Sequence, residues 1–137
     1  LPLIDGEHRL KIPGETLLPG WRVTARVVPN ESGLEQAQAY RAALDADVAG
    51  GDLVVRTRRL GDRFQPLGMD RPKKLQDFMV DAKVPVACRD RVPLVCSLEE
   101  ALWVVGRRIG ERAKVTDSTK HVLLIEFENR AVPPHSG

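Results

Sequence analysis

Apolar and polar side chains alternate with a period of two over residues 21–28, WRVTARVV. Successive side chains of a β-strand point to opposite faces, so this alternation predicts a strand with one buried face. Other short runs rich in β-branched and apolar residues also predict strands. These runs cover residues 9–12, 53–59, 93–98, 102–106 and 121–128. Residues 93–98 and 102–106 are expected to form a hairpin.

One segment, residues 73–84, has the helical period instead. Its apolar positions fall at i, i+3, i+4 and i+7 and form a stripe that must be buried. Pro72 suits the first turn of a helix and Pro85 ends the run. The stripe consists of Leu75, Phe78, Met79 and Ala82.

Three further segments have weaker patterns. Residues 34–48 contain good helix formers, which favours a helix, although their second half also fits a strand entering an Asp-rich turn. Residues 60–69 contain two glycines and a proline and predict a loop, with Phe64, Leu67 and Met69 anchoring it to the core. Residues 86–93 and 107–116 predict short turns or loops.

The element pattern predicts an α+β fold dominated by β-structure, in one domain or in two small ones that share a core. The chain has 137 residues, of which 42% are hydrophobic and only 4% are aromatic. Val, Leu and Ala must therefore fill most of the core. The two cysteines, Cys88 and Cys96, are too few for a zinc site and are expected to be reduced thiols. The opening LPLIDG reads as the middle of a longer protein.

The charge is unevenly distributed. The net charge is only +2, but residues 56–91 hold 10 Lys/Arg against 5 Asp/Glu, and residues 107–114 hold 4 against 1. Residues 1–52 are net acidic, with 5 Lys/Arg against 8 Asp/Glu. Two concentrated basic segments are a stronger indication of a nucleic-acid partner than the overall charge.

The sequence lacks the motifs of an active site. It has no phosphate-binding GxxxxGK[ST] or GxGxxG motif, and its three histidines are far apart along the chain. Asp62 lies between arginines and is expected to be a turn residue that binds its own loop. Asp45 and Asp47 are spaced like metal ligands, but two carboxylates without a third partner are weak evidence.

Four stretches of the sequence together resemble the C-terminal domain of bacterial tRNA(Ile)-lysidine synthetase. They are LVVRTRRLGDRFQPLGM, KKLQDFMVDAKVP, RDRVPLV and LWVVGRRIGER, in this order over about residues 53–127. Leu60 departs from the family, which commonly has proline there, as do Arg71 and Pro72, where small or basic residues are usual.

The resemblance implies a sandwich-like fold similar to a domain of the phenylalanyl-tRNA synthetase β subunit, with a strand in the second half of residues 34–48. It also implies a non-catalytic, cytoplasmic, tRNA-gripping part of an ATP-dependent ligase that joins lysine to the wobble cytidine of tRNA(Ile). The ligase's SGGxDS loop, which uses ATP and Mg²⁺, is absent from this chain. The implied partners are tRNA(Ile), on its acceptor-stem side, and the catalytic N-terminal domain.

We expect residues 1–52 to be an upstream β segment, residues 53–128 the family domain and residues 129–137 a flexible tail. The basic side chains that neither fill the core nor shape the loop are expected to bind RNA phosphates. One alternative is a protein-interaction or homodimer surface with solvated charges, which an exposed apolar patch near Trp21 or Trp103 would favour. A hydrolytic enzyme ranks last, because the sequence shows no nucleophile with a general base beside it. The expected RNA-binding residues are Arg56, Arg58, Arg59, Arg63, Lys73, Lys74, Arg107, Arg108 and Arg112.

Overall fold

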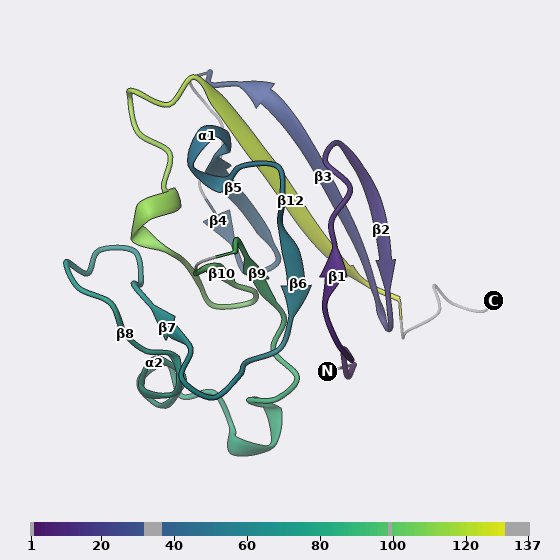
Figure 1. The fold of residues 1–137 in the computed structure, drawn as a ribbon, viewed down its shortest axis with the longest axis vertical. Helices are drawn as coiled ribbons and strands as arrows, with labels where there is room; N and C mark the ends of the chain where they lie inside the picture. Colours follow the sequence, from purple (N-terminus) through teal and green to yellow (C-terminus); the bar gives the residue numbers. More distant parts are fainter. Residues whose placement is uncertain (1, 32–36, 99, 131–137) are drawn as a thin grey trace.

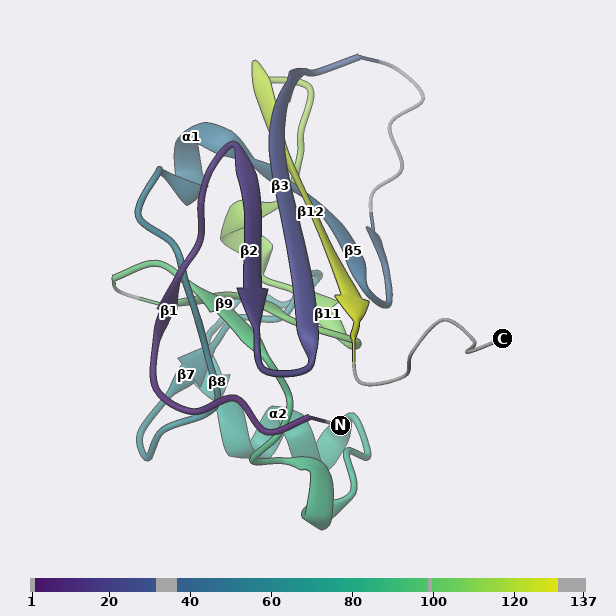
Figure 2. The ribbon, with the colours of Figure 1, turned by 90° about the vertical axis from the view of Figure 1, so that its right-hand side faces the viewer.

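The computed structural model describes residues 2–31, 37–98 and 100–130. Two five-stranded antiparallel sheets form its body (Figure 1). The long sheet has the strand order β2-β3-β12-β5-β4, and the short sheet has the order β1-β6-β9-β10-β11. A two-stranded ribbon, β7-β8, and the helix α2 lie at one end of the molecule (Figure 2). The prediction of a β-dominated α+β fold is confirmed.

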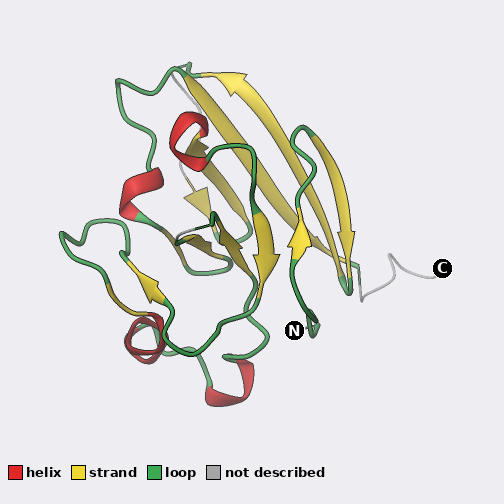
Figure 3. Ribbon diagram, viewed as in Figure 1, coloured by secondary structure: helices red, strands yellow, loops and turns green. Residues whose placement is uncertain are grey.

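The strands outnumber and outweigh the helical elements in the described residues (Figure 3). The helical elements are α1 (Ala46–Ala49), α2 (Leu75–Asp81) and the 3-10 turns η1 (Val86–Cys88) and η2 (Glu111–Ala113). The strands are β1 (His8–Arg9), β2 (Gly14–Leu18), β3 (Trp21–Pro29), β4 (Ala37–Gln38), β5 (Arg41–Asp45), β6 (Val54–Arg56), β7 (Arg63–Phe64), β8 (Lys73–Lys74), β9 (Leu94–Cys96), β10 (Ala101–Val104), β11 (Arg108–Ile109) and β12 (His121–Asn129).

The long sheet is built around β3 and β12, which pair in register from His121 opposite Pro29 to Asn129 opposite Trp21. As the alternating pattern predicts, β3 buries its odd-numbered residues up to Ala25 and exposes Arg22 and Thr24. β2 was not predicted as a strand, because the Pro-Gly pairs on either side of it indicate turns. It forms because all five of its residues pair with β3.

β9 and β10 of the short sheet are buried on both faces, whereas the edge strands β1 and β11 each expose an arginine. Every residue of β9 and β10 is buried. Val95 and Trp103 face the long sheet, whereas Leu94, Cys96 and Val104 pack with α2 on the other side. The continuous apolar runs of these strands therefore reflect a middle layer, because a strand with one solvated face would alternate.

A chain of aromatic rings crosses the core between the two sheets. Phe127 of β12 contacts Trp103 of β10 edge-on, with ring centroids 5.4 Å apart, and contacts Trp21 of β3 at 5.6 Å. Tyr40 stacks on Trp21, with ring centroids 5.7 Å apart. Trp21 and Trp103 are 2% and 1% exposed. The two tryptophan rings therefore belong to the core and are not themselves part of an exposed surface.

A second core lies between α2 and the short sheet. The predicted helical stripe supplies Leu75, Phe78 and Met79, all buried, while Ala82 is partly buried against them. Phe78 meets Phe64 of β7 edge-on at 4.9 Å. The burial predicted for this stripe is confirmed.

The helix itself is shorter than the predicted span of 73–84. Lys73 and Lys74 pair with β7 as strand β8, so α2 begins only at Leu75. It ends at Asp81, because Lys83 has a left-handed φ of 57° and the N–H of Val84 donates to the carbonyl of Met79 at 2.9 Å. This arrangement closes the last helical turn before Pro85 is reached.

Helix propensity is misleading in the segment 34–48. Residues 41–45 form β5, which pairs with β12 and buries Ala42, Ala43 and Leu44. The strand alternative that the resemblance implied is thus confirmed for these residues, while residues 34–36 lie outside the described part. Asp45 then caps α1, accepting hydrogen bonds from the N–H groups of Asp47 and Val48.

Other predictions have mixed outcomes. Strand 53–59 is observed as β6, which ends at Arg56, and strand 9–12 is observed as the short β1. Phe64 is buried, but Leu67 and Met69 are 37% and 44% exposed and do not anchor the loop. The hairpin and the final strand are confirmed. The predicted tail lies almost wholly outside the described residues, and none of the described helices is long and apolar enough to span a membrane.

Candidate nucleic-acid interface

The loop that follows β6 is fixed by an ion pair within its own sequence. The guanidinium of Arg56 donates to both carboxylate oxygens of Asp62, at 2.8 and 3.0 Å. Both side chains are largely buried, with 13% and 15% of their areas exposed. The backbone N–H of Arg59 donates to the same carboxylate at 2.7 Å. Asp62 is therefore the predicted turn residue, and we call residues 57–62 the basic loop.

This network shifts the pKa values of Arg56 and Asp62. Burial raises the pKa of Asp62, but the hydrogen bonds from Arg56 and from the Arg59 N–H outweigh it, so the net pKa is lowered. The hydrogen bond to Asp62 raises the pKa of Arg56. Both groups stay charged at neutral pH and hold the loop through a charge-assisted, two-pronged contact.

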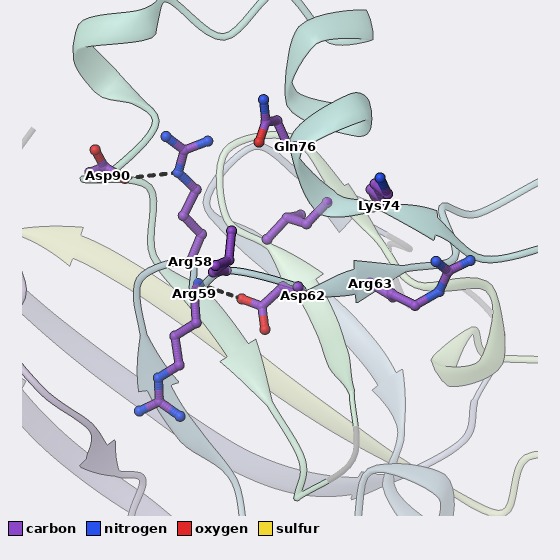
Figure 4. A pocket seen from close by; sticks show the side chains of 10 residues that line it. Arg58, Arg59, Asp62, Arg63, Lys74, Gln76 and Asp90 are labelled. Atoms are coloured by element: carbon purple, nitrogen blue, oxygen red, sulfur yellow. Dashed lines mark hydrogen bonds and ion pairs between the residues drawn. The ribbon is translucent and has the colours of Figure 1, made fainter.

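A concavity of about 630 Å³ opens between the basic loop and the start of α2. Figure 4 shows side chains from the loop, from β7 and β8, and from the segment after η1 around it. The lining residues combine four cationic side chains with two carboxylates and two leucines. They are Arg58, Arg59, Leu60, Gly61, Asp62, Arg63, Lys74, Leu75, Gln76 and Asp90.

The four cations of the concavity differ in how they are held. Arg58 is the most restrained, because its Nε donates to Asp90 at 2.8 Å and its side chain is 25% exposed. Arg59 reaches away to Glu7 at 2.7 Å and stays half exposed. The Arg63 guanidinium donates to the carbonyl of Pro72 at 3.4 Å and has no ion-pair partner among the described residues. Within the described ranges, Lys74 has no ion-pair partner. Arg63 and Lys74 are thus the cations most available to an anion.

The structure gives Arg56 and Lys73 structural partners. Arg56 is committed to Asp62, and Lys73 pairs with Asp81 at the far end of α2, where its side chain is 27% exposed. Lys73 lies in β8, ahead of α2, and its ammonium group balances the carboxylate of Asp81. We therefore propose that Arg56 and Lys73 hold the basic loop and β8 in place and do not themselves contact RNA.

The second basic segment does not line the concavity. Arg112 pairs with Glu100 at 3.2 Å, and Arg108 is exposed on β11. Both flank Glu111, whose carboxylate accepts the N–H of Gly68, so they lie beside the far end of the 60–69 loop. Arg107 follows Gly106, whose N–H donates to Ala39 at the β4-β5 turn. The structure thus brings four of the nine predicted RNA-binding residues together at the concavity and leaves Arg107, Arg108 and Arg112 outside it.

Two polar residues of the lining were not identified from the sequence, and neither was Leu60. Asp90 orients Arg58 across 32 residues of sequence, and Gln76 lies on the first turn of α2. The ion pair of Asp90 depends on the folding of α2 and η1, which no local pattern encodes.

The remaining candidates for chemistry have structural roles. Asp45 caps α1 and also accepts the Thr119 hydroxyl at 2.8 Å. Burial raises the pKa of the Cys96 thiol to about 11, and both cysteines are free. The described residues contain no cluster of three or more His, Cys, Asp or Glu suited to a metal ion.

The lowered pKa of Asp62 predicts an acid-sensitive contribution to stability. An unfolded Asp titrates near 3.9, so the Arg56–Asp62 pair contributes fully above about pH 5 and is lost as the pH falls through the lower folded pKa. The difference in unfolding free energy between the wild type and Asp62→Asn should therefore shrink from about pH 6 to about pH 3. Urea unfolding at several pH values would measure it, and a constant difference would contradict the prediction.

Comparisons with known proteins agree on one family. The model of the TilS substrate C-terminal domain matches residues 53–126. The chain is 50% identical over 127 residues to a tRNA(Ile)-lysidine synthase of Dehalococcoides mccartyi and 42% identical over 120 residues to one of Caldanaerobacter subterraneus. The first match covers 92% of this chain but only 27% of the relative, and the second match covers 86% of this chain and 26% of the relative. This chain therefore spans about a quarter of the length of these relatives.

A solved structure confirms the fold. The chain superposes on a protein described as the crystal structure of a TilS C-terminal domain, with a TM-score of 0.76 and 26% sequence identity. The match covers 93% of this chain and 98% of that chain. The chain belongs to the family of TilS substrate C-terminal domains.

Proposed function

We propose that this chain is the tRNA-binding C-terminal part of a tRNA(Ile)-lysidine synthase and contacts tRNA phosphates through its cationic concavity. Family membership gives the context, and one observation carries the proposal. Arg63 and Lys74 lie on adjacent strands, pair opposite each other, and present their charges at the concavity. Charged groups that the fold leaves unneutralised beside a hollow surface suit a polyanion.

The side chains of this surface suit an RNA stem better than single-stranded bases that stack on aromatic rings. A-form stems offer phosphates and 2′-hydroxyls, which proteins contact through shape and charge. The six aromatic residues of the chain include Trp21, Trp103, Phe64 and Phe127, which are buried and cannot stack on bases.

In the whole protein, this part would hold tRNA(Ile) while a separate N-terminal domain, which binds ATP and Mg²⁺, joins lysine to the wobble cytidine. The chain would thus have a binding role in the cytoplasm and no catalytic one. Arg58 and Arg59 would add to the field around the concavity, and Arg107, Arg108 and Arg112 would extend contact beyond it.

The salt dependence of tRNA binding tests this proposal. We expect the affinity of the 137-residue chain to fall steeply between about 50 and 200 mM salt, because each neutralised phosphate releases counterions. The double variant Arg63→Ala/Lys74→Ala should bind roughly tenfold more weakly and lose about two units of salt slope, one per lost contact. Filter binding or fluorescence anisotropy would measure both.

A matched control removes two charges elsewhere. Arg26 is exposed on β3 and Lys120 is exposed just before β12, both on or beside the long sheet and outside the concavity. Arg26→Ala/Lys120→Ala changes the net charge equally and should leave the affinity within about twofold. Equal losses in the two double variants would show that only the net charge matters and would refute the concavity as the site.

A further inference from the structure

An apolar side chain projects from the centre of the basic loop. Leu60 has 104% of its reference area exposed and lines the concavity together with Arg59, Arg63 and Lys74. A single exposed leucine is ordinary on a protein surface. This one differs because the fold holds it in place among cations that are proposed to bind RNA.

The backbone around Leu60 is restrained on both sides. The N–H of Asp62 donates to the carbonyl of Arg59 at 3.1 Å, which closes a tight turn over Leu60 and Gly61. Gly61 has a φ of 86°, a conformation that glycine adopts without strain. The N–H of Leu75 donates to the carbonyl of Asp62 at 2.9 Å and ties the turn to α2. Because the turn is already ordered, a ligand that contacts Leu60 has little backbone to immobilise.

The charges around Leu60 indicate the kind of ligand. Both carboxylates of the concavity are already paired, Asp62 with Arg56 and Asp90 with Arg58. The surface next to Leu60 is therefore cationic and complementary to a polyanion. Nucleic acid combines phosphates with flat apolar base faces, but a continuous stem hides those faces by stacking. They become accessible where a stem ends and the next nucleotide is unpaired.

We infer that Leu60 packs against an unstacked base at the end of an RNA stem, while Arg63 and Lys74 contact the phosphates of that stem. This inference rests on the proposed function and adds which part of the RNA the concavity receives. The leucine contact is apolar and involves no counterion release, so it changes affinity and preference for stem ends but leaves the salt slope unchanged.

Two RNAs with the same stem test the inference. One is a hairpin that ends in a short single-stranded 3′ overhang, and the other is the same hairpin with a blunt end, so that the loop is common to both. We expect the wild-type chain to bind the overhang hairpin roughly fivefold more tightly, the gain expected from partly burying a leucine. Leu60→Ser should bind both RNAs with the affinity of the blunt hairpin and with the wild-type salt slope.

The control is Leu98→Ser, because Leu98 is 92% exposed and does not line the concavity. It should keep the preference for the overhang. Equal wild-type affinity for the two RNAs, or an unchanged preference in Leu60→Ser, would overturn the inference. So would a change in sedimentation of the RNA-free chain on Leu60→Ser, because Leu60 would then contact a second copy. Salt-independent binding of both RNAs would instead refute the proposed function itself.

Discussion

Replacing Asp62 by asparagine is expected to lower the free energy of unfolding by about 3 kcal/mol at neutral pH, because it leaves the largely buried Arg56 guanidinium without a counter-charge. Asparagine keeps an oxygen that can accept the Arg59 N–H, so the substitution isolates the charge. Removing one partner of a buried pair is costly because the other stays desolvated and uncompensated. Urea unfolding monitored by tryptophan fluorescence would measure the loss.

A double-mutant cycle separates the pair from its surroundings. Arg56→Met removes the buried cation and keeps much of its apolar stem, and the double variant Arg56→Met/Asp62→Asn removes both charges. We expect the double variant to be more stable than the sum of the single losses predicts, by about 1 to 3 kcal/mol. Strict additivity, or a loss below about 0.5 kcal/mol for Asp62→Asn, would mean that the pair does not hold the basic loop.

Replacing Trp103 by alanine is expected to cost about 3 to 5 kcal/mol. Its ring is 1% exposed and meets Phe127 across the boundary between the two sheets. Truncation would remove the largest side chain that β10 contributes to that core and leave a cavity that both sheets resist closing. Thermal or urea unfolding would give the value.

Because typical domains are stable by only 5 to 15 kcal/mol, Trp103→Ala could fail to fold. Trp103→Phe keeps an aromatic ring and should cost about half as much. The matched control is Leu98→Ala, a large-to-small change at a 92% exposed residue, which should stay within about 0.5 kcal/mol of the wild type. A loss below 1 kcal/mol for Trp103→Ala would show that the aromatic contact does not join the two sheets.

Much of the fold follows from local patterns. The alternation of residues 21–28 and the helical stripe at Leu75, Phe78 and Met79 predicted buried faces that the structure contains. These patterns succeed because the repeat of a strand or a helix fixes which side chains share a face. β5 shows their limit, since its helix-forming residues are a strand only because β12 pairs with them.

The candidate site was partly readable in the same way. The sequence placed the basic charge in residues 56–91 and 107–114 and identified Asp62 as a turn residue. It could not rank the cations, because Lys73, Arg58 and Arg59 have partners from separate elements. Availability to a ligand depends on such pairings across the fold.

By itself, the sequence determined the β-dominated class, the core face of α2 and the family. The tertiary structure decided where α2 begins and ends, which cations stay available, and that Leu60 projects at the concavity. The physical reason is the range of the interactions. Periodicity and turn chemistry act within a few residues, whereas ion pairs and strand pairing join residues that only the complete fold brings together.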